Sequence, residues 1–132
     1  MGRLGPWRRL LRCGAGIGVL AVLTVGPVHA REPVAPVGQV ALAQLPDEAR
    51  KVHRSILAGG PFLYSKDGSV FGNRERTLPR ERRGFYREYT VATPGERSRG
   101  ARRIICGGVM PTAPSSCYYT GDHYASFNRI TP

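Results

Sequence analysis

The sequence is poor in residues that bind metals or cross-link a chain. Only three of its 132 residues are cysteine and three are histidine. Their spacing matches no zinc site, so we expect a protein without a bound metal. Acidic residues are also few, nine against 20 arginine and lysine residues, which gives a formal net charge of +11. This excess favours an anionic partner, either nucleic acid or a membrane surface, but a basic protein with no such partner fits the charge equally well.

Internal repeats are missing, and only one long apolar run is present. This run, Gly14–Val25, follows a basic start and is too short to serve comfortably as a permanent membrane span. The small residues of Val28-His29-Ala30 then offer a cleavage site. We predict that residues 1–30 are a secretory signal peptide. The mature protein is expected outside the cell, without stable membrane association.

The mature chain would hold 102 residues and keep 16 basic and nine acidic side chains, a net charge of +7. About 100 residues can bury one modest core, so we expect one domain and a monomer. Residues 31–41 contain prolines and a glycine without any periodic pattern. They are predicted to be a flexible lead-in, and residues 42–132 to be the folded domain.

The fold class follows from a change of apolar period along the domain. Pro46 and the acids after it favour a helix start, and Gly59-Gly60-Pro61 an end. Apolar residues recur between them at spacings of four, three and four: Leu45, Ala49, Val52 and Ile56. Short strands with a period of two are then predicted at 85–91, 102–106, 116–119 and 124–130. The pattern predicts an α+β fold in which one N-terminal amphipathic helix packs on a short-stranded antiparallel sheet.

Cys106 and Cys117 are the only cysteines after residue 30. Export would make a disulfide between them chemically feasible. Opposed residues on neighbouring strands often lie too far apart for disulfide geometry. Two separate thiols, with Cys106 buried, fit the sequence at least as well as a bridge, so both alternatives stay open.

The last third of the chain carries the residue types that metal-free cleavage of RNA needs. RNA supplies its own nucleophile, the 2′-hydroxyl, so the protein needs a base, an acid and cations around the phosphate. Alternation in 85–91 places Glu88, the candidate base, on the face opposite Tyr89 and Val91. Arg99 and Arg103 are candidate phosphate clamps, and His123 is the candidate acid. Taken singly, Glu88 and the two arginines are more often ion-paired or solvated surface residues.

A second segment, residues 70–75, has the residue types for recognising guanine. The carboxylate of Glu75 can accept both donors on one edge of guanine. Backbone N–H groups of the turn at Asn73 and Arg74 can donate to the guanine oxygen, and Phe71 can stack on the base. An ordinary surface β-turn is the alternative for this segment.

Several motifs between residues 40 and 130 occur together in one order. They are Gly60-Pro61-Phe62, Asp67-Gly68, Val70-Phe71, Asn73-Arg74-Glu75, Glu88-Tyr89-Thr90-Val91, Thr93-Pro94-Gly95, Arg102 to Gly107 and Tyr118 to Tyr124. This set resembles the secreted guanyl-specific ribonucleases of microbes, above all the streptomycete type and more distantly barnase. The resemblance implies a microbial ribonuclease fold with catalytic positions at Glu88, Arg99, Arg103 and His123. It further implies a guanine loop at Asn73, Arg74 and Glu75, and a tyrosine near the phosphate, Tyr124.

By this resemblance the chain would cleave single-stranded RNA after guanosine, through a 2′,3′-cyclic phosphate to a 3′-phosphate, without any cofactor. A small acidic inhibitor of the barstar type would be a candidate partner. The rivals are a ribonuclease without base preference, and a cationic RNA-binding or membrane-active protein without catalysis. The sequence departs from the family pattern at Gly72, in the missing terminus-linking disulfide, and in a longer stretch from Gly108 to Cys117.

Overall fold

The computed structural model describes Gly26 and residues 36–132. Apart from Gly26, the predicted signal peptide lies outside the described residues, as does the first part of the predicted lead-in. No helix in the described part of the chain is long and apolar enough to cross a membrane.

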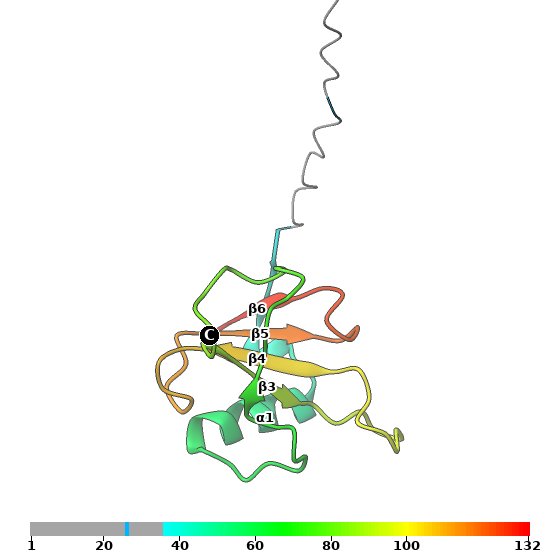
Figure 1. Ribbon diagram of the computed structural model, residues 1–132. Helices are drawn as coiled ribbons and strands as arrows, with labels where there is room; N and C mark the ends of the chain where they lie inside the picture. The colour runs from blue at the N-terminus through cyan, green and yellow to red at the C-terminus, as the bar shows by residue number, and fades with distance from the viewer. Residues whose placement is uncertain (1–25, 27–35) are drawn as a thin grey trace, which may run out of the picture. The chain divides into compact units, whose positions relative to one another are not determined.

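One helix and a six-stranded sheet make up the domain (Figure 1). The helix is α1 (Asp47–Ala58), preceded by a short 3₁₀ turn at Leu42–Gln44. The strands, in sheet order, are β1 (Gly38–Ala41), β6 (Asn128–Thr131), β5 (Ser116–Thr120), β4 (Arg103–Gly107), β3 (Tyr86–Thr90) and β2 (Ser69–Val70). All neighbours pair antiparallel except β1 and β6, which pair parallel. The predicted α+β class is confirmed.

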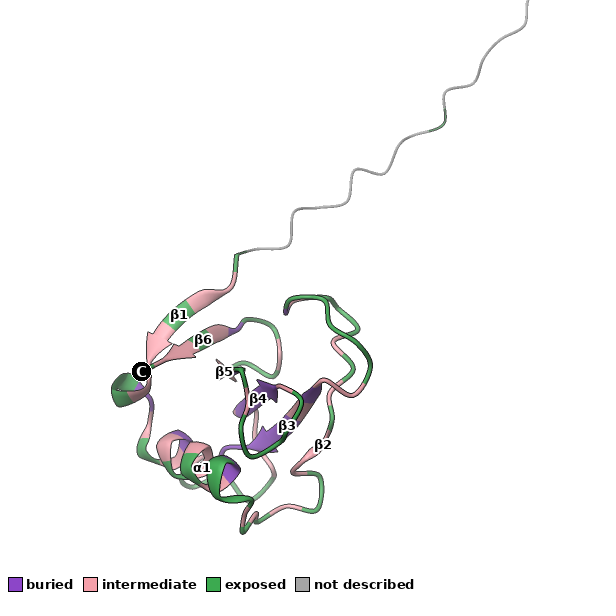
Figure 2. Ribbon diagram, turned by 90° about the vertical axis from the view of Figure 1, so that its left-hand side faces the viewer, coloured by how far each residue is buried: buried purple, intermediate pink, exposed green. Residues whose placement is uncertain are grey.

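The helix α1 forms where the sequence predicts it. It begins after Pro46 and ends at Gly59, whose φ of 80° provides the left-handed cap that glycine adopts at low cost. Its buried residues, Ala49 and Ile56, face the sheet, and the helix packs mainly on β4. Figure 2 shows the buried colour on one side of α1 and on β3 and β4.

The sheet buries both of its faces, each with a different set of side chains. On the helix side lies a cluster that includes Tyr89, Val91 and Ile104. On the opposite side lies a second cluster that includes Ile105 and Tyr118. The pairs Glu88↔Ile105 and Ile105↔Tyr118 place Glu88 with this second set. The predicted position of Glu88, on the face opposite Tyr89 and Val91, is confirmed.

Two predicted boundaries are wrong at the ends of the domain. Residues 38–41, predicted as part of a flexible lead-in, form β1 along β6, with Gly38 opposite Asn128. A strand of four residues that pairs with a distant segment leaves no periodic pattern of its own. The strand predicted for 124–130 is formed only from Asn128 onward, because the preceding residues form a turn.

Of the two alternatives that the sequence left open for the cysteines, the structure has the bridge: Cys106 and Cys117 form a disulfide with an S–S distance of 1.99 Å. The two cysteines are directly paired on β4 and β5, with Cα atoms 4.1 Å apart. Of the two kinds of antiparallel pair, the non-hydrogen-bonded kind brings side chains closer together, and this short Cα separation fits it. The bridge closes the loop between the two strands, residues 108–115.

Candidate active site

The four predicted catalytic residues come from four separate places in the fold. Glu88 lies in the middle of β3, Arg103 begins β4, Arg99 lies in the loop that connects these strands, and His123 lies in the turn after β5. The register pairs Thr90 with Arg103 and Arg103 with Thr120, so the strand residues share one face. Pairing of the strands therefore brings residues distant in the sequence to one edge of the second cluster.

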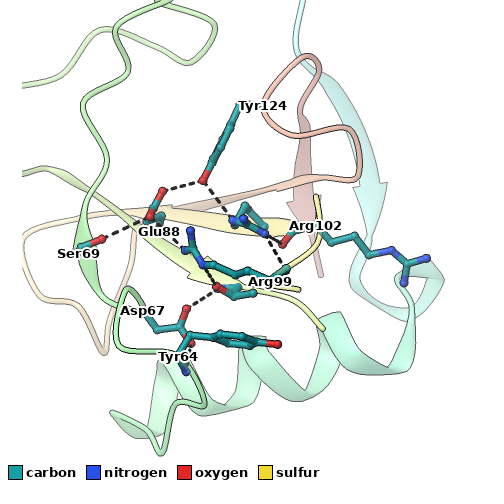
Figure 3. A network of polar contacts seen from close by, with 9 residues as sticks. Tyr64, Asp67, Ser69, Glu88, Arg99, Arg102 and Tyr124 are labelled. Carbon is teal, nitrogen blue, oxygen red and sulfur yellow. Dashed lines mark hydrogen bonds and ion pairs between the residues drawn. The ribbon is translucent and has the colours of Figure 1, made fainter. Parts of the chain in front are cut away.

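The carboxylate of Glu88 is nearly buried, with 7% of the residue exposed. Its Oε2 accepts a hydrogen bond of 2.8 Å from the hydroxyl of Tyr124. Its Oε1 accepts from Arg99 Nη2 at 3.2 Å and from Ser69 Oγ at 3.5 Å (Figure 3). Every partner is a donor, which is the arrangement that suits an ionised carboxylate, and lone pairs remain for another donor.

Tyr124 connects the carboxylate to a buried cation. Its hydroxyl donates to Glu88 and accepts a hydrogen bond from Arg103 Nε at 3.2 Å. Burial and then the hydrogen bond to Glu88 raise the pKa of the Tyr124 phenol, while Arg103 acts in the opposite direction. The phenol therefore stays protonated near neutral pH and remains a donor at the site.

Arg103 is a buried guanidinium, with only 2% of the residue exposed. Its Nη1 donates to two backbone carbonyls, those of Arg102 at 2.7 Å and Arg99 at 3.3 Å. Within the described residues no carboxylate lies at ion-pair distance from it. A buried cation without a counter-ion is unfavourable unless an anion binds beside it. Arg103 is therefore suited to hold a phosphate.

A chain of polar contacts fixes Arg99 beside the carboxylate. Arg99 Nε donates to the hydroxyl of Thr90 at 2.7 Å, and Thr90 N donates to Asp67 Oδ1 at 2.7 Å. Asp67 also accepts from the backbone N–H of Tyr64 at 3.3 Å (Figure 3). The loop before β2 thus positions a guanidinium that also contacts Glu88.

His123 is exposed and lies at the margin of the site. Its backbone N–H donates to Ala101 O at 3.1 Å, and its ring centroid lies 4.8 Å from that of Tyr124. Its φ of 53° and the φ of 70° at Tyr124 are unusual for residues other than glycine. Asp122 supports this turn by accepting hydrogen bonds from Ser126, which lower the pKa of the Asp122 carboxyl.

A pocket of about 380 Å³ lies between this cluster and the loop after β2. Glu88 and Arg99 line it. All five predicted substrate-binding residues line it too: Phe71, Asn73, Arg74, Glu75 and Tyr124. The rings of Phe71 and Tyr124 are stacked, with centroids 5.4 Å apart and an interplanar angle of 22°. Arg103 and His123 do not line the pocket, but both contact Tyr124, which does.

The side chain of Asn73 has a structural task within the loop. Its Nδ2 donates to Leu78 O at 2.9 Å, and its Oδ1 accepts from Leu78 N at 3.1 Å. Its φ of 46° places the backbone in the left-handed region. These bonds shape the loop while leaving the turn's backbone at the pocket. Contact with a ligand through backbone N–H groups, as the sequence suggested, is compatible with this geometry.

Sequence reasoning missed several residues of the site. Thr90 and Asp67 position Arg99, and three further side chains line the pocket: Lys66, Thr77 and Phe127. Thr90 could have been found, because it lies two residues after Glu88 and so on the same face. Asp67 could not, since it contacts Thr90 from 23 residues away. No group of three or more metal-binding side chains gathers among residues 36–132.

Comparison with known proteins agrees with this geometry. A family model described as ribonuclease matches residues 31–131. The chain is 54% identical to guanyl-specific ribonuclease Sa of Kitasatospora aureofaciens, over 70% of this chain and 93% of that protein. It is 44% identical to guanyl-specific ribonuclease Sa3 of the same organism, over 92% and 94% of the two. A crystal structure of ribonuclease Sa2 with guanosine-2′-cyclophosphate is similar, with 40% identity, a TM-score of 0.65, and coverage of 74% of this chain and 98% of that chain.

Proposed function

The chain belongs to the ribonuclease family, and we propose that it cleaves single-stranded RNA after guanosine, forming a 2′,3′-cyclic phosphate and then a 3′-phosphate. The observation that carries this proposal is the Glu88–Tyr124–Arg103 cluster beside a pocket lined by the guanine loop. A general base and a phosphate-binding cation there adjoin a pocket of suitable size for a nucleobase.

In the first step Glu88 takes the proton of the 2′-hydroxyl, and the 2′-oxygen attacks phosphorus. The bond from phosphorus to the 5′-oxygen breaks, and His123 gives that oxygen a proton. In the second step His123 takes a proton from water and the water oxygen attacks phosphorus. The bond from phosphorus to the 2′-oxygen breaks, and Glu88 returns a proton to that oxygen, which leaves a 3′-phosphate. Each proton transfer of this kind contributes roughly 10²–10⁴-fold to the rate. His123 is exposed beside Tyr124, where a leaving group can reach solvent.

The arginines and Tyr124 stabilise charge on the phosphate. Arg103 has backbone partners but no carboxylate at ion-pair distance in the described part of the chain, so an incoming phosphate supplies its counter-ion. Preorganised donors of this kind act most strongly where charge grows toward the transition state. The substrate itself carries the nucleophile, so these side chains suffice without a metal or organic cofactor.

Recognition of guanine is assigned to the loop after β2. Phe71 offers an aromatic face, the turn at Asn73 and Arg74 offers backbone donors, and Glu75 offers a carboxylate at the pocket. Guanine presents two donors to one carboxylate, whereas adenine lacks both. Adenine in the pocket would leave Glu75 without its partners, which costs more than a missing contact alone.

The test is cleavage of defined RNA in EDTA, with the product ends mapped. The wild-type protein should cut after guanosine and leave cyclic and then 3′-phosphate ends. Glu75→Gln should lower the GpN to ApN ratio of kcat/KM, while Glu48→Gln, which removes one charge on α1, should keep it. An unchanged ratio in Glu75→Gln would remove Glu75 from base recognition. Failure of the wild-type protein to cut in EDTA would reject the metal-free mechanism.

We further propose that the protein is secreted as a monomer after loss of residues 1–30. N-terminal sequencing of secreted material should start at Arg31 or within a few residues. A small acidic inhibitor protein of the barstar type would fit the basic site electrostatically. Inhibition by such a protein should weaken as salt concentration rises.

A further inference from the structure

A second cavity, of about 640 Å³, borders the guanine loop. It shares residues 70–74 with the first pocket, so these residues form a wall between the two. Its remaining lining comes from residues 81–84 and Tyr86, which lead into β3. The chain segment that carries both sides is mostly exposed, as the loop between β2 and β3 in Figure 2 shows. We call this second cavity the outer groove.

The outer groove is positively charged. Arg74, Arg82 and Arg83 line it, against the single acid Glu81. All four residues are exposed, and none takes part in an ion pair found among residues 36–132. The guanidiniums are therefore free to bind an anion from solvent, and the groove concentrates three of them around one hollow.

The backbone around the outer groove is fixed, although its arginine side chains are exposed. The N–H of Phe85 donates to Arg82 O at 3.1 Å and closes the turn that carries the arginines. The hydroxyl of Tyr86, a buried residue, donates to Pro79 O at 2.8 Å and ties the other arm of the loop to β3. The groove is thus bounded by an ordered turn rather than by a free surface chain.

We propose that the outer groove binds the RNA phosphate on the 5′ side of the recognised guanosine. The inference rests on the proposed function, which places the base in the first pocket and the 3′-phosphate at Glu88 and Arg103. The strand then continues on its 3′ side from that cluster, so only its 5′ side is free to cross the wall formed by residues 70–74. The groove there offers cations without sequence readout, as sites that track single-stranded RNA do.

The experiment compares three substrates: GpU, the 5′-extended UpUpGpU and the 3′-extended GpUpU. The variant is Arg82→Gln with Arg83→Gln. The matched control is Arg54→Gln with Arg129→Gln, which removes two exposed positive charges from α1 and β6. Wild-type cleavage of GpU tests the proposed function separately, because that substrate has no phosphate for the outer groove.

The expected result is a fall in the ratio of kcat/KM for UpUpGpU to that for GpU, on the order of tenfold at low ionic strength in the groove variant. The ratio should fall far less in the control, and the ratio for GpUpU to GpU should not respond to the groove variant. In the variant, the dependence of log kcat/KM on log salt for UpUpGpU should become shallower by about 0.7 if one phosphate contact is lost.

Binding of UpUpG with a 2′-deoxyguanosine, which lacks the nucleophile, gives a readout free of chemistry. Its Kd should rise in the groove variant by the same factor as the ratio falls. Equal losses on GpU and UpUpGpU, an equal effect of the control, or a loss confined to GpUpU would each overturn the proposal. So would an unchanged ratio with an unchanged Kd.

Discussion

The two faces of the sheet bury side chains of different chemical character, although the same strands form both faces. The face toward α1 buries apolar side chains, with Val91 and Ile104 fully enclosed. The opposite face also buries apolar residues, but at its edge it buries Glu88 and Arg103. Burial of apolar area stabilises a fold, whereas burial of charge costs stability unless each charge is paired. One face therefore supplies the stability that allows the other to hold reactive charges.

The difference also shows in how the charges are held. Glu88 accepts hydrogen bonds from three donors, while Arg103 relies on carbonyls and one phenol. Buried charges held in this way are typical of active sites, where residues needed for activity lower the stability of the fold. Substitutions on the two faces should accordingly separate activity from stability.

The largest effect on activity is expected from Glu88→Gln on the sheet face opposite α1, which we call the site face. Loss of the base should lower kcat/KM for GpU by roughly 10²–10⁴-fold, and His123→Ala should lower the transfer step by a similar factor. Urea unfolding should show a smaller loss of stability in Glu88→Gln than in Ile104→Ala, because the amide keeps the shape of the side chain and the ion pair that it removes, with Arg99, is partly exposed. Activity near the wild-type level in either variant would reject its assigned role.

On the face toward α1, the helix face, Ile104→Ala should instead lower stability and leave activity unchanged. Removal of a fully buried side chain should lower the free energy of unfolding by about 2–5 kcal/mol. The folded fraction should keep a wild-type kcat, measured well below the midpoint of denaturation. A loss of kcat comparable to that of Glu88→Gln would break the contrast between the faces.

The disulfide belongs to the helix-face cluster. Replacement of both Cys106 and Cys117 by alanine should lower the free energy of unfolding by about 2–3 kcal/mol, since the closed loop is short. Thiol counting on the denatured, unreduced wild-type protein should find no thiol in this pair. Two reactive thiols would contradict the bridge.

Thr90→Val sharpens the comparison within the site face. Loss of the hydroxyl leaves Arg99 Nε without its acceptor, and kcat should fall about tenfold, consistent with one charge-assisted hydrogen bond. KM should change less, and Thr90→Ser should restore the rate. Failure of serine to rescue would show that the methyl group, not the hydroxyl, matters.

The smallest effect concerns the turn that carries His123. Hydrogen bonds from Ser126 hold the pKa of Asp122 below the ordinary value of an aspartate in an unfolded chain. The stabilisation that follows is present above that unfolded-state value and is lost as pH falls through the lower folded-state pKa. NMR chemical shifts of Tyr124 and Ser126 should therefore report a change in this acid range, and Asp122→Asn should abolish it. Identical acid titrations in the two proteins would contradict this account.

Much of the fold could be predicted because local patterns and tertiary packing agree. The helical spacing of Ala49 and Ile56 and the alternation around Glu88 both survive in the structure. β1 could not be predicted, because its partner among the described strands, β6, lies some 90 residues later along the chain. The disulfide stayed open at the sequence level because sequence does not reveal which cross-strand pairs come close.

In the candidate site, too, the sequence indicated some features and could not show others. Residue types and motif order indicated nine candidate residues, and the structure brings seven of them to one pocket. The links among them were not predictable, since Tyr124 meets Glu88 from 36 residues away. Nor was the structural use of the Asn73 side chain, which depends on the path of the loop to Leu78.

The parallel pairing of β1 with β6 makes the order of synthesis matter. β1 has no strand partner until residues 128–131 exist, and the turn with His123 and Tyr124 is also made late. Such long-range pairing slows folding and delays it until nearly the whole domain is available. A ribosome would therefore have translated almost all of this chain before the assembled site could attack RNA. The topology itself therefore postpones activity during synthesis.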